Sequence, residues 1–143
     1  VRHDIAPIRF VTNNLPAAEK LAKESAAEIH LLGGQLLPHQ LIVVGPGAGL
    51  SLSPWRFDIA YLSAEGMNSE GLWNSRDAIS EFQRHVCGRT RQAIFCIDES
   101  KLNRTAPSYL MSWQEVRHLI TSAARRTLES FNINLNGATL ECV

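Results

Sequence analysis

The sequence predicts an α/β fold with an open, mostly parallel sheet and helices on both faces. Short apolar runs rich in β-branched residues alternate with segments whose apolar residues follow helical spacing. Most of the apolar runs are continuous, which is typical of strands covered on both faces in a parallel sheet. The length of 143 residues fits about one domain, and a hydrophobic content of 45% suffices for a core.

The first half of the chain begins as a strand followed by a helix. "IRFVT" (8–12) predicts the strand, and "NNLPAAEKLAKES" (13–25) predicts a helix with an asparagine cap and an early proline. Further strands are expected in "EIHLLGG" (28–34) and "QLIVVG" (40–45). "FDIAYLSAEG" (57–66) predicts a buried strand over its first nine residues.

The second half continues the alternation after a polar loop, "MNSEGLWNS" (67–75). The elements expected next are a helix over 76–86 with Ile79, Phe82 and Val86 on one face, a strand in "RQAIFCID" (91–98), a capping box in "SWQE" (112–115), a strand in "HLIT" (118–121), an amphipathic helix marked by Ala124, Leu128 and Phe131, and a strand in "ATLECV" (138–143).

Composition excludes several classes of protein. The 14 basic and 14 acidic residues give zero formal net charge, so any contact with DNA is expected outside this chain. Cys87, Cys96 and Cys142 form no C-x-x-C pair, which favours a reducing, cytoplasmic setting. No apolar run approaches the ~20 residues of a membrane span, so no membrane partner is expected. The opening "VRHDIAP" lacks the apolar core of a signal peptide and starts without Met, so we expect a fragment.

Charged residues follow two of the predicted strands. Glu65 and Asp98 each end a strand expected inside the sheet, and Lys101 follows in "DESK". Ligands bind outside the carboxyl ends of strands in open α/β sheets, where carboxylates accept from sugar hydroxyls and a lysine attracts phosphate. The same residues are equally consistent with helix caps, mutual ion pairs or a solvated turn.

Other motifs favour structural interpretations. "VVGPGAGLSLS" (43–53) has G-x-G-x-G where a dinucleotide fingerprint needs G-x-G-x-x-G, so we interpret it as a turn leading into a short helix. "LLGG" alone indicates a tight turn. The five histidines lack metal-ligand spacing, and no cysteine has a nucleophile context. Two small basic groups, Arg89 with Arg91 and Arg125 with Arg126, are interpreted as solvated faces.

Four blocks, taken in order, resemble one family. They are "FVTNNLPAAEKLA" (10–22), "IHLLGGQLLPHQLIVVGPGA" (29–48), "RFDIAYLSAEGMNSEGL" (56–72) and "DESKLNR" (98–104). They resemble the T-N-S/N, L-G-G, V-G, F-D-x-A-F-L-G-A-D-G and D-S-S-K-F blocks of the C-terminal sensor domain of DeoR-family bacterial transcription regulators. The resemblance covers nearly the whole chain, and the ordered set is specific where single blocks are not.

The resemblance implies a fold like that of ribose-5-phosphate isomerase, with 1–143 as a single sensor domain. It implies a phosphorylated sugar or related metabolite as the effector, a homo-oligomer, and a repressor that contacts DNA only through a helix-turn-helix domain absent from this chain. It implies no catalytic residue, metal or cofactor. Carried over position by position, the ligand-binding residues are Asn13, Gly33, Gly34, Glu65, Gly66 and Lys101.

Three departures from the family pattern bear on the ligand. Glu65 stands where the family usually has Asp, and Gln83 stands where it often has Lys. The family's first strand, with a Ser/Gly/Thr-rich phosphate loop, is expected before Val1, and its loss removes backbone N–H donors for phosphate.

Two other functions compete with the sensor. Sugar-phosphate isomerases and deaminases share the implied fold. Isomerases of this kind carry a G-A-D-E-like block and a Gly-rich K-G-G-G stretch, whereas this chain has S-A-E-G and no such stretch. Glu65 is therefore the single candidate base for proton transfer. A dimerisation module with a degenerate pocket is favoured by the departures at Glu65 and Gln83.

Overall fold

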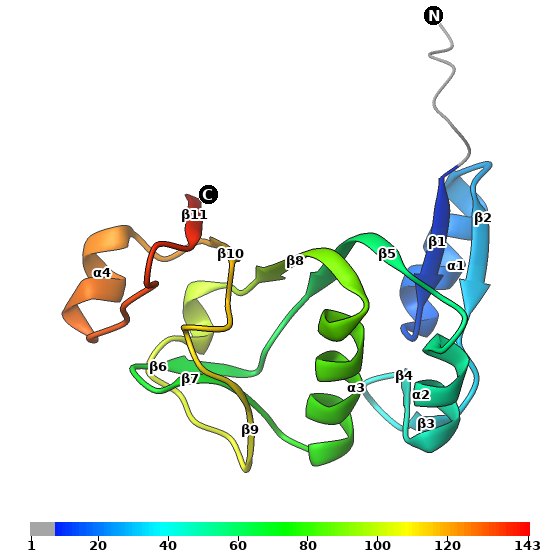
Figure 1. The fold of residues 1–143 in the computed structure, drawn as a ribbon, viewed down its shortest axis with the longest axis horizontal. Coiled ribbons are helices and arrows are strands. Elements are labelled where there is room, and N and C mark those ends of the chain that lie inside the picture. Colours follow the sequence, from blue (N-terminus) through cyan, green and yellow to red (C-terminus); the bar gives the residue numbers. More distant parts are fainter. Residues whose placement is uncertain (1–7) are drawn as a thin grey trace, which may run out of the picture. The chain divides into compact units, whose positions relative to one another are not determined.

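The computed structural model describes residues 8–143, so the opening heptapeptide and His3 lie outside the described residues. The chain divides into two compact units, an N-terminal unit (Val1–Pro54) and a C-terminal unit (Trp55–Val143). Figure 1 shows their elements. Within the described residues, no helix is long and apolar enough to cross a membrane.

The N-terminal unit opens with the predicted strand and helix. β1 (Arg9–Thr12) leads into α1 (Leu15–Glu24), and β2 (Glu28–Leu31) then pairs with β1 in parallel. Asn14 caps α1, because its side chain accepts a hydrogen bond of 2.8 Å from the backbone N–H of Ala17. The β–α–β order expected for a parallel sheet is confirmed here.

The rest of this unit pairs in antiparallel fashion, unlike most of the predicted sheet. β3 (Gln35–Leu37), which the sequence did not predict, forms an antiparallel hairpin with β4 (Ile42–Val44). His39 and Leu41 turn the chain with φ angles of 69° and 54°. A left-handed conformation is uncommon for a residue such as leucine, so local patterns did not reveal the turn. The predicted short helix after the glycine-rich turn is α2 (Pro46–Leu52).

The C-terminal unit contains the predicted parallel sheet. Its four strands lie in the order β11–β10–β8–β5, and all three pairings are parallel. The strands are β5 (Phe57–Leu62), β8 (Thr90–Cys96), β10 (His118–Thr121) and β11 (Thr139–Cys142). All four appear within the predicted segments or one residue outside them.

The expectation that β5 is a buried inner strand is wrong. Among the described residues β5 pairs only with β8, and Ile59 and Tyr61 are 48% and 68% exposed. An apolar run can indicate a strand, but its burial depends on what packs against it. β8 does lie between two strands, as expected for the strand that precedes Asp98.

The segment expected to be a polar loop is instead part of a second sheet. β6 (Gly66–Asn68), β7 (Gly71–Asn74) and β9 (Ser108–Met111) pair in antiparallel fashion. Asn68 Oδ1 accepts from the backbone N–H of Glu70 at 3.0 Å and from Trp73 Nε1 at 3.0 Å, so the polar residues stabilise a tight hairpin.

The core of the C-terminal unit joins its two sheets to α3. α3 (Asp77–Gly88) buries the predicted face of Ile79, Phe82 and Val86. Two shorter elements, η1 (Glu99–Lys101) and α4 (Arg125–Ser130), follow strands β8 and β10. The residues buried in the main cluster include Met67, Leu72, Phe95, Leu110, Leu119 and Leu128. Burial of such a cluster contributes most of the stability, at about 25 cal/mol per Å² of apolar surface.

Candidate functional site

Glu65 lies beyond the carboxyl end of β5, where the sequence places a ligand contact. Its backbone N–H donates to the carbonyl of Trp73 at 2.9 Å, and its Oε2 accepts from the backbone N–H of Ser75, just before α3. The carboxylate therefore stabilises the turn into α3, which is one of the structural roles that the sequence left open. Two carboxylate oxygens can accept about four hydrogen bonds, so this contact does not exhaust the group.

Gly66 has a packing role that the sequence did not reveal. It is buried at the start of β6, and a Cβ atom added to it would lie 2.5 Å from the carbonyl oxygen of Arg104. Arg104 N donates to Met67 O at 3.3 Å, and Met67 forms a parallel bridge with Leu102. A side chain at position 66 would thus push β6 away from the segment that follows Lys101.

Lys101 ends the short η1 helix at the carboxyl end of β8. Asp98 caps this helix by accepting from Ser100 N at 2.8 Å, and Glu99 N donates to Ser122 Oγ at 2.9 Å. The hydrogen bonds from Ser100 hold the pKa of Asp98 below its ordinary value, and the positive charge of Lys101 acts in the same direction. Asp98 is therefore a capping group, while Lys101 is the cation on this segment.

The C-terminal unit thus brings Glu65, Gly66 and Lys101 to one end of its parallel sheet. The bridge between Met67 and Leu102 places the residue after Gly66 beside the residue after Lys101. A carboxylate and an ammonium group at this end suit a ligand with hydroxyl groups and a phosphate.

Beside Glu65 lies a buried polar network whose members, apart from Gln83, the sequence analysis missed. Asn74 donates to Gln83 Oε1 at 2.8 Å and to Ser80 Oγ at 3.2 Å, and Gln83 Nε2 donates to Ser63 O at 2.7 Å. Ser108 Oγ completes the network at 2.8 Å from Ser80 Oγ. In the sequence, the polar Ser80 beside the apolar Ile79 of the predicted helix could have pointed to this network. Gln83 is therefore a neutral group that secures the end of β5.

The N-terminal unit holds the other three predicted residues. Asn13 Nδ2 donates to Val43 O at 2.9 Å, and Val43 N donates to Asn13 O at 2.8 Å, so Asn13 fastens the end of β1 to β4. Gly34 has a φ of +145°, and an added Cβ would lie 2.8 Å from Val43 Cγ1 and from Val44 O. Both residues therefore have structural tasks at β4.

Gly33 differs from its neighbour. An added Cβ at Gly33 would meet only Ser51 Oγ, at 3.8 Å, which is an ordinary van der Waals contact. The backbone at this exposed position has no packing reason to be glycine. Of the three predicted glycine contacts, Gly33 is therefore the one that packing does not require to be glycine.

Two of the three cysteines have a raised pKa. Burial, together with the negative charge of Glu115, raises the pKa of Cys87 to about 11, and burial raises the pKa of Cys96. A thiol with a raised pKa is a poor nucleophile near neutral pH. Within residues 8–143, no group of three or more His, Cys, Asp or Glu side chains could hold a metal ion.

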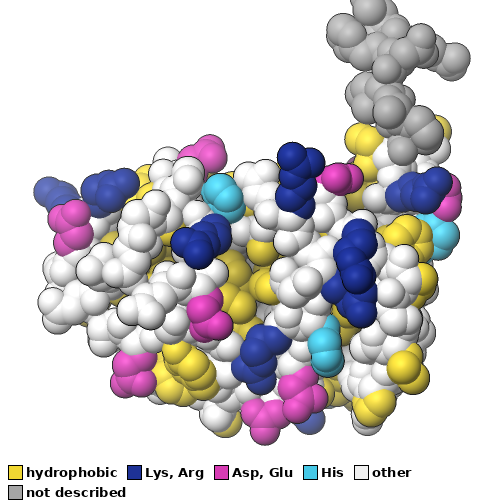
Figure 2. All heavy atoms as spheres, viewed as in Figure 1, with side chains coloured by type: hydrophobic (Ala, Val, Ile, Leu, Met, Phe, Trp, Pro, Cys, Tyr) yellow, Lys and Arg dark blue, Asp and Glu magenta, His cyan; other side chains and the backbone are white. Residues whose placement is uncertain are grey.

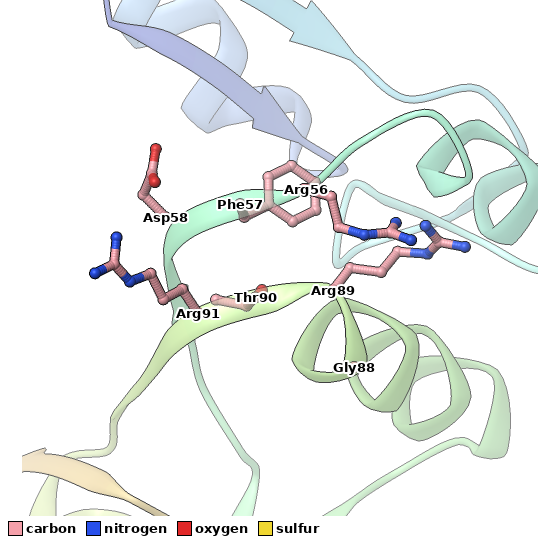
Figure 3. Close-up of a pocket in the computed structure, with 7 residues that line it drawn as sticks. All are labelled: Arg56, Phe57, Asp58, Gly88, Arg89, Thr90 and Arg91. Atoms are coloured by element: carbon pink, nitrogen blue, oxygen red, sulfur yellow. The ribbon is translucent and has the colours of Figure 1, made fainter.

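Two hollows of the C-terminal unit lie away from the predicted residues. One, of about 370 Å³, is lined by residues 56–58 and 88–91, at the amino ends of β5 and β8 (Figure 3). The other, of about 510 Å³, lies between α4 and the segment up to Leu140. Neither contains a residue that the sequence predicted as a ligand contact, so the predicted site is defined by its side chains and strand ends.

Comparison with known proteins identifies the family. The family model described as "DeoR C terminal sensor domain" matches residues 3–123. The chain belongs to the DeoR C-terminal sensor domain family. Elements α4 and β11 lie beyond the matched residues. The ordered blocks that the sequence analysis assigned to the DeoR family all lie within the match.

The curated relatives of this DeoR-type sensor domain are regulators. The L-fucose operon activator of Escherichia coli (strain K12) is 29% identical over 115 residues, which cover 80% of this chain and 47% of that protein. The glycerol-3-phosphate regulon repressor of the same strain is 28% identical over 123 residues, with 81% and 46% covered. The HTH-type transcriptional regulator UlaR of Shigella dysenteriae is 24% identical over 115 residues, with 80% and 45% covered. The chain spans about half the length of these relatives.

Proposed function

We propose that this chain is the effector-binding domain of a DeoR-family transcriptional regulator, and that its effector is a phosphorylated sugar or a related metabolite. The observation that carries the proposal is the family match over residues 3–123. The names of two relatives, one referring to L-fucose and one to glycerol 3-phosphate, support this class of effector. In the whole regulator, a helix-turn-helix domain before Val1 would contact DNA.

Each predicted contact has a proposed role. Lys101 attracts the phosphate as a point charge. Glu65 accepts hydrogen bonds from sugar hydroxyls at the carboxylate lone pairs that the backbone N–H of Ser75 does not occupy. Gly66 maintains the backbone path beside Lys101. In the N-terminal unit, Gly33 lets a ligand approach the backbone, while Asn13 and Gly34 hold the strand end and turn that present it.

The first test is thermal unfolding of the chain with a panel of phosphorylated sugars and glycerol 3-phosphate, with free sugars as controls. A ligand present at ~100 times its dissociation constant adds about 2.7 kcal/mol, which corresponds to a shift of roughly 5–10 °C for a domain of this size. We expect one phosphorylated compound to give such a shift. A flat response to every compound would favour a dimerisation module over a sensor.

Variants then assign the response to residues. Lys101→Gln is expected to abolish the shift, Lys101→Arg to restore part of it, and Lys20→Gln, on the exposed face of α1, to leave it unchanged. Gly33→Ala fits the space in the N-terminal unit and is expected to weaken binding without loss of stability. A ligand response that survives Lys101→Gln would remove Lys101 from the site.

The direction of regulation follows from operator binding. The relatives' names include an activator and a repressor. We propose a repressor, so the effector is expected to release the full-length protein from its operator in a gel-shift assay. Tighter operator binding with the effector would contradict a repressor that its effector releases from DNA. Turnover of the bound phosphosugar that disappears in Glu65→Gln would show an enzyme.

A further inference from the structure

The larger of the two hollows in the C-terminal unit lies outside the part of the chain that the family model matches. Its volume is about 510 Å³, and it lies between one face of α4 and the segment that leads into β11. All of its lining residues follow residue 123, where the family match ends. A volume of this size is typical of small-molecule sites. The hollow shares no residue with the proposed effector site.

The wall opposite α4 is a hydrogen-bonded turn. Ala138 N donates to Leu135 O at 2.8 Å, and the two residues between them, Asn136 and Gly137, have φ angles of 49° and 82°. Two successive positive φ angles are typical of a type I′ turn, for which Asn-Gly is the preferred sequence. Asn134 Oδ1 accepts from Asn136 N at 3.0 Å and braces this turn. These local hydrogen bonds hold the wall in place without a ligand.

The hollow has an apolar floor made of four side chains. Leu128 and Ile133 are buried in the core cluster, and Leu135 and Leu140 are half-buried and packed against it. Apolar surface that remains in contact with water favours a ligand that covers it. The floor therefore suits a ligand with an apolar part.

Two opposite charges stand at the rim of the hollow. Arg125 and Glu129 lie one helical turn apart on the face of α4 that lines it, and both are exposed. Figure 2 shows basic and acidic side chains next to each other over α4, at the left edge of this face. The rim therefore carries a positive and a negative group side by side, with no net charge.

These two side chains are not used by the fold. In the part of the chain that the structure describes, neither side chain forms a hydrogen bond or an ion pair. Pairs with the same spacing on α1, by contrast, are joined at N···O distances of 3.4 Å and 2.5 Å. An exposed pair on a helix contributes little to stability, so both groups are open to a ligand at little cost.

We propose that this hollow binds an amino acid with an apolar side chain. A guanidinium group binds a carboxylate through paired, charge-assisted N–H donors, so Arg125 holds the carboxylate of the ligand. Glu129 accepts from its ammonium group, and the apolar floor receives its side chain. A phosphate or another simple anion is disfavoured, because Glu129 repels what Arg125 attracts. The proposal does not rest on the proposed effector site.

The test is an NMR titration of the ¹⁵N-labelled chain with L-leucine at neutral pH. We expect saturable shifts of the backbone amides of Asn134, Asn136 and Gly137 and of the side-chain amide of Asn132. Glycine has both charges but no side chain, so it should bind at least about tenfold more weakly. Sorbitol, an uncharged polyol, and inorganic phosphate should give no saturable shifts at these residues.

Two truncated ligands match the two charged residues. 4-Methylpentanoate lacks the ammonium group of leucine, and 3-methylbutylamine lacks its carboxylate. Arg125→Gln should weaken the binding of leucine and of 4-methylpentanoate at least about fivefold, and should not weaken that of 3-methylbutylamine. Glu129→Gln should weaken the binding of leucine and of 3-methylbutylamine and spare 4-methylpentanoate. The matched controls are Arg126→Gln, at an exposed arginine of α4 outside the hollow, and Glu81→Gln, at an exposed glutamate of α3.

The outcomes separate this site from the proposed effector site. Lys101→Gln should leave the response to leucine intact, and a thermal unfolding curve checks that each variant folds. The absence of saturable shifts with leucine, or an unchanged leucine affinity in folded Arg125→Gln and Glu129→Gln, would overturn the proposal. Equal weakening in Arg126→Gln would show a general charge effect and would overturn it as well. Tighter binding of sorbitol than of leucine would overturn the assignment to amino acids.

Discussion

At the carboxyl ends of β5 and β8, the polar groups are engaged with the backbone: Glu65 accepts from Ser75 N, and Asp98 caps η1. At the amino ends of the same strands, Arg56 and Arg89 converge on one carbonyl oxygen beside a hollow. The carboxyl end is thus held by hydrogen bonds to the backbone, while the amino end gathers arginine side chains beside a hollow. Motif residues can be retained for packing as well as for ligand contact.

The largest expected effect on stability comes from substituting a glycine at the carboxyl end of β5, compared with a glycine beside its amino end. Gly66→Ala should lower the free energy of unfolding by about 2–4 kcal/mol, since its Cβ would lie 2.5 Å from the Arg104 carbonyl oxygen. Gly88→Ala, beside the hollow, meets nothing within 4 Å and should change stability by at most about 1 kcal/mol. Urea unfolding of both variants measures the difference. Equal effects would break the contrast between a packed and an open end.

A smaller effect is expected when a cation is introduced at the carboxyl end. Gln83→Lys removes one of the two acceptors of Asn74 Nδ2, and the loss of this hydrogen bond at a buried amide costs about 1–3 kcal/mol. The new charge lies near Ser63 and should tighten phosphosugar binding several-fold. Unfolding curves with and without ligand separate the two effects, and Gln83→Met serves as the uncharged control. Weaker binding in Gln83→Lys than in Gln83→Met would contradict the placement of the phosphate.

The smallest expected effect concerns pH at the carboxyl end. The pKa of Asp98 is lowered in the folded chain. The ionised carboxyl therefore contributes to folding stability above the ordinary aspartate pKa, and this stability is lost as the pH falls through the lower pKa of the folded state. Ser100→Ala removes the first of its causes and should raise that pKa toward the ordinary range. NMR titration of the Asp98 carboxyl in both proteins measures the shift. An identical pKa in the two would assign the lowering to the backbone and Lys101.

Much of the fold was predictable because local patterns carried it. The strands around Phe10, Ile94 and Leu119 and the helix around Phe82 lie where apolar spacing placed them. The β6–β7 hairpin was not predicted, since its polar residues act through turn hydrogen bonds of Asn68 and not through periodicity. The exposure of Ile59 and Tyr61 was not predicted either, because it depends on which strands pair with β5.

The sequence by itself determined the family, the segments that form the parallel strands and the longer helices, and the list of candidate site residues. Ordered motifs and local spacing are properties of the chain alone, so they survive without coordinates. Only the tertiary structure showed that position 66 needs glycine because the Arg104 carbonyl oxygen lies close to it, whereas packing does not require glycine at position 33. It also showed that Arg56 and Arg89 share one acceptor. Those relations join residues far apart in the sequence: the β5–β8 register brings Arg56 beside Arg89, and the bridge between Met67 and Leu102 brings Gly66 beside Arg104.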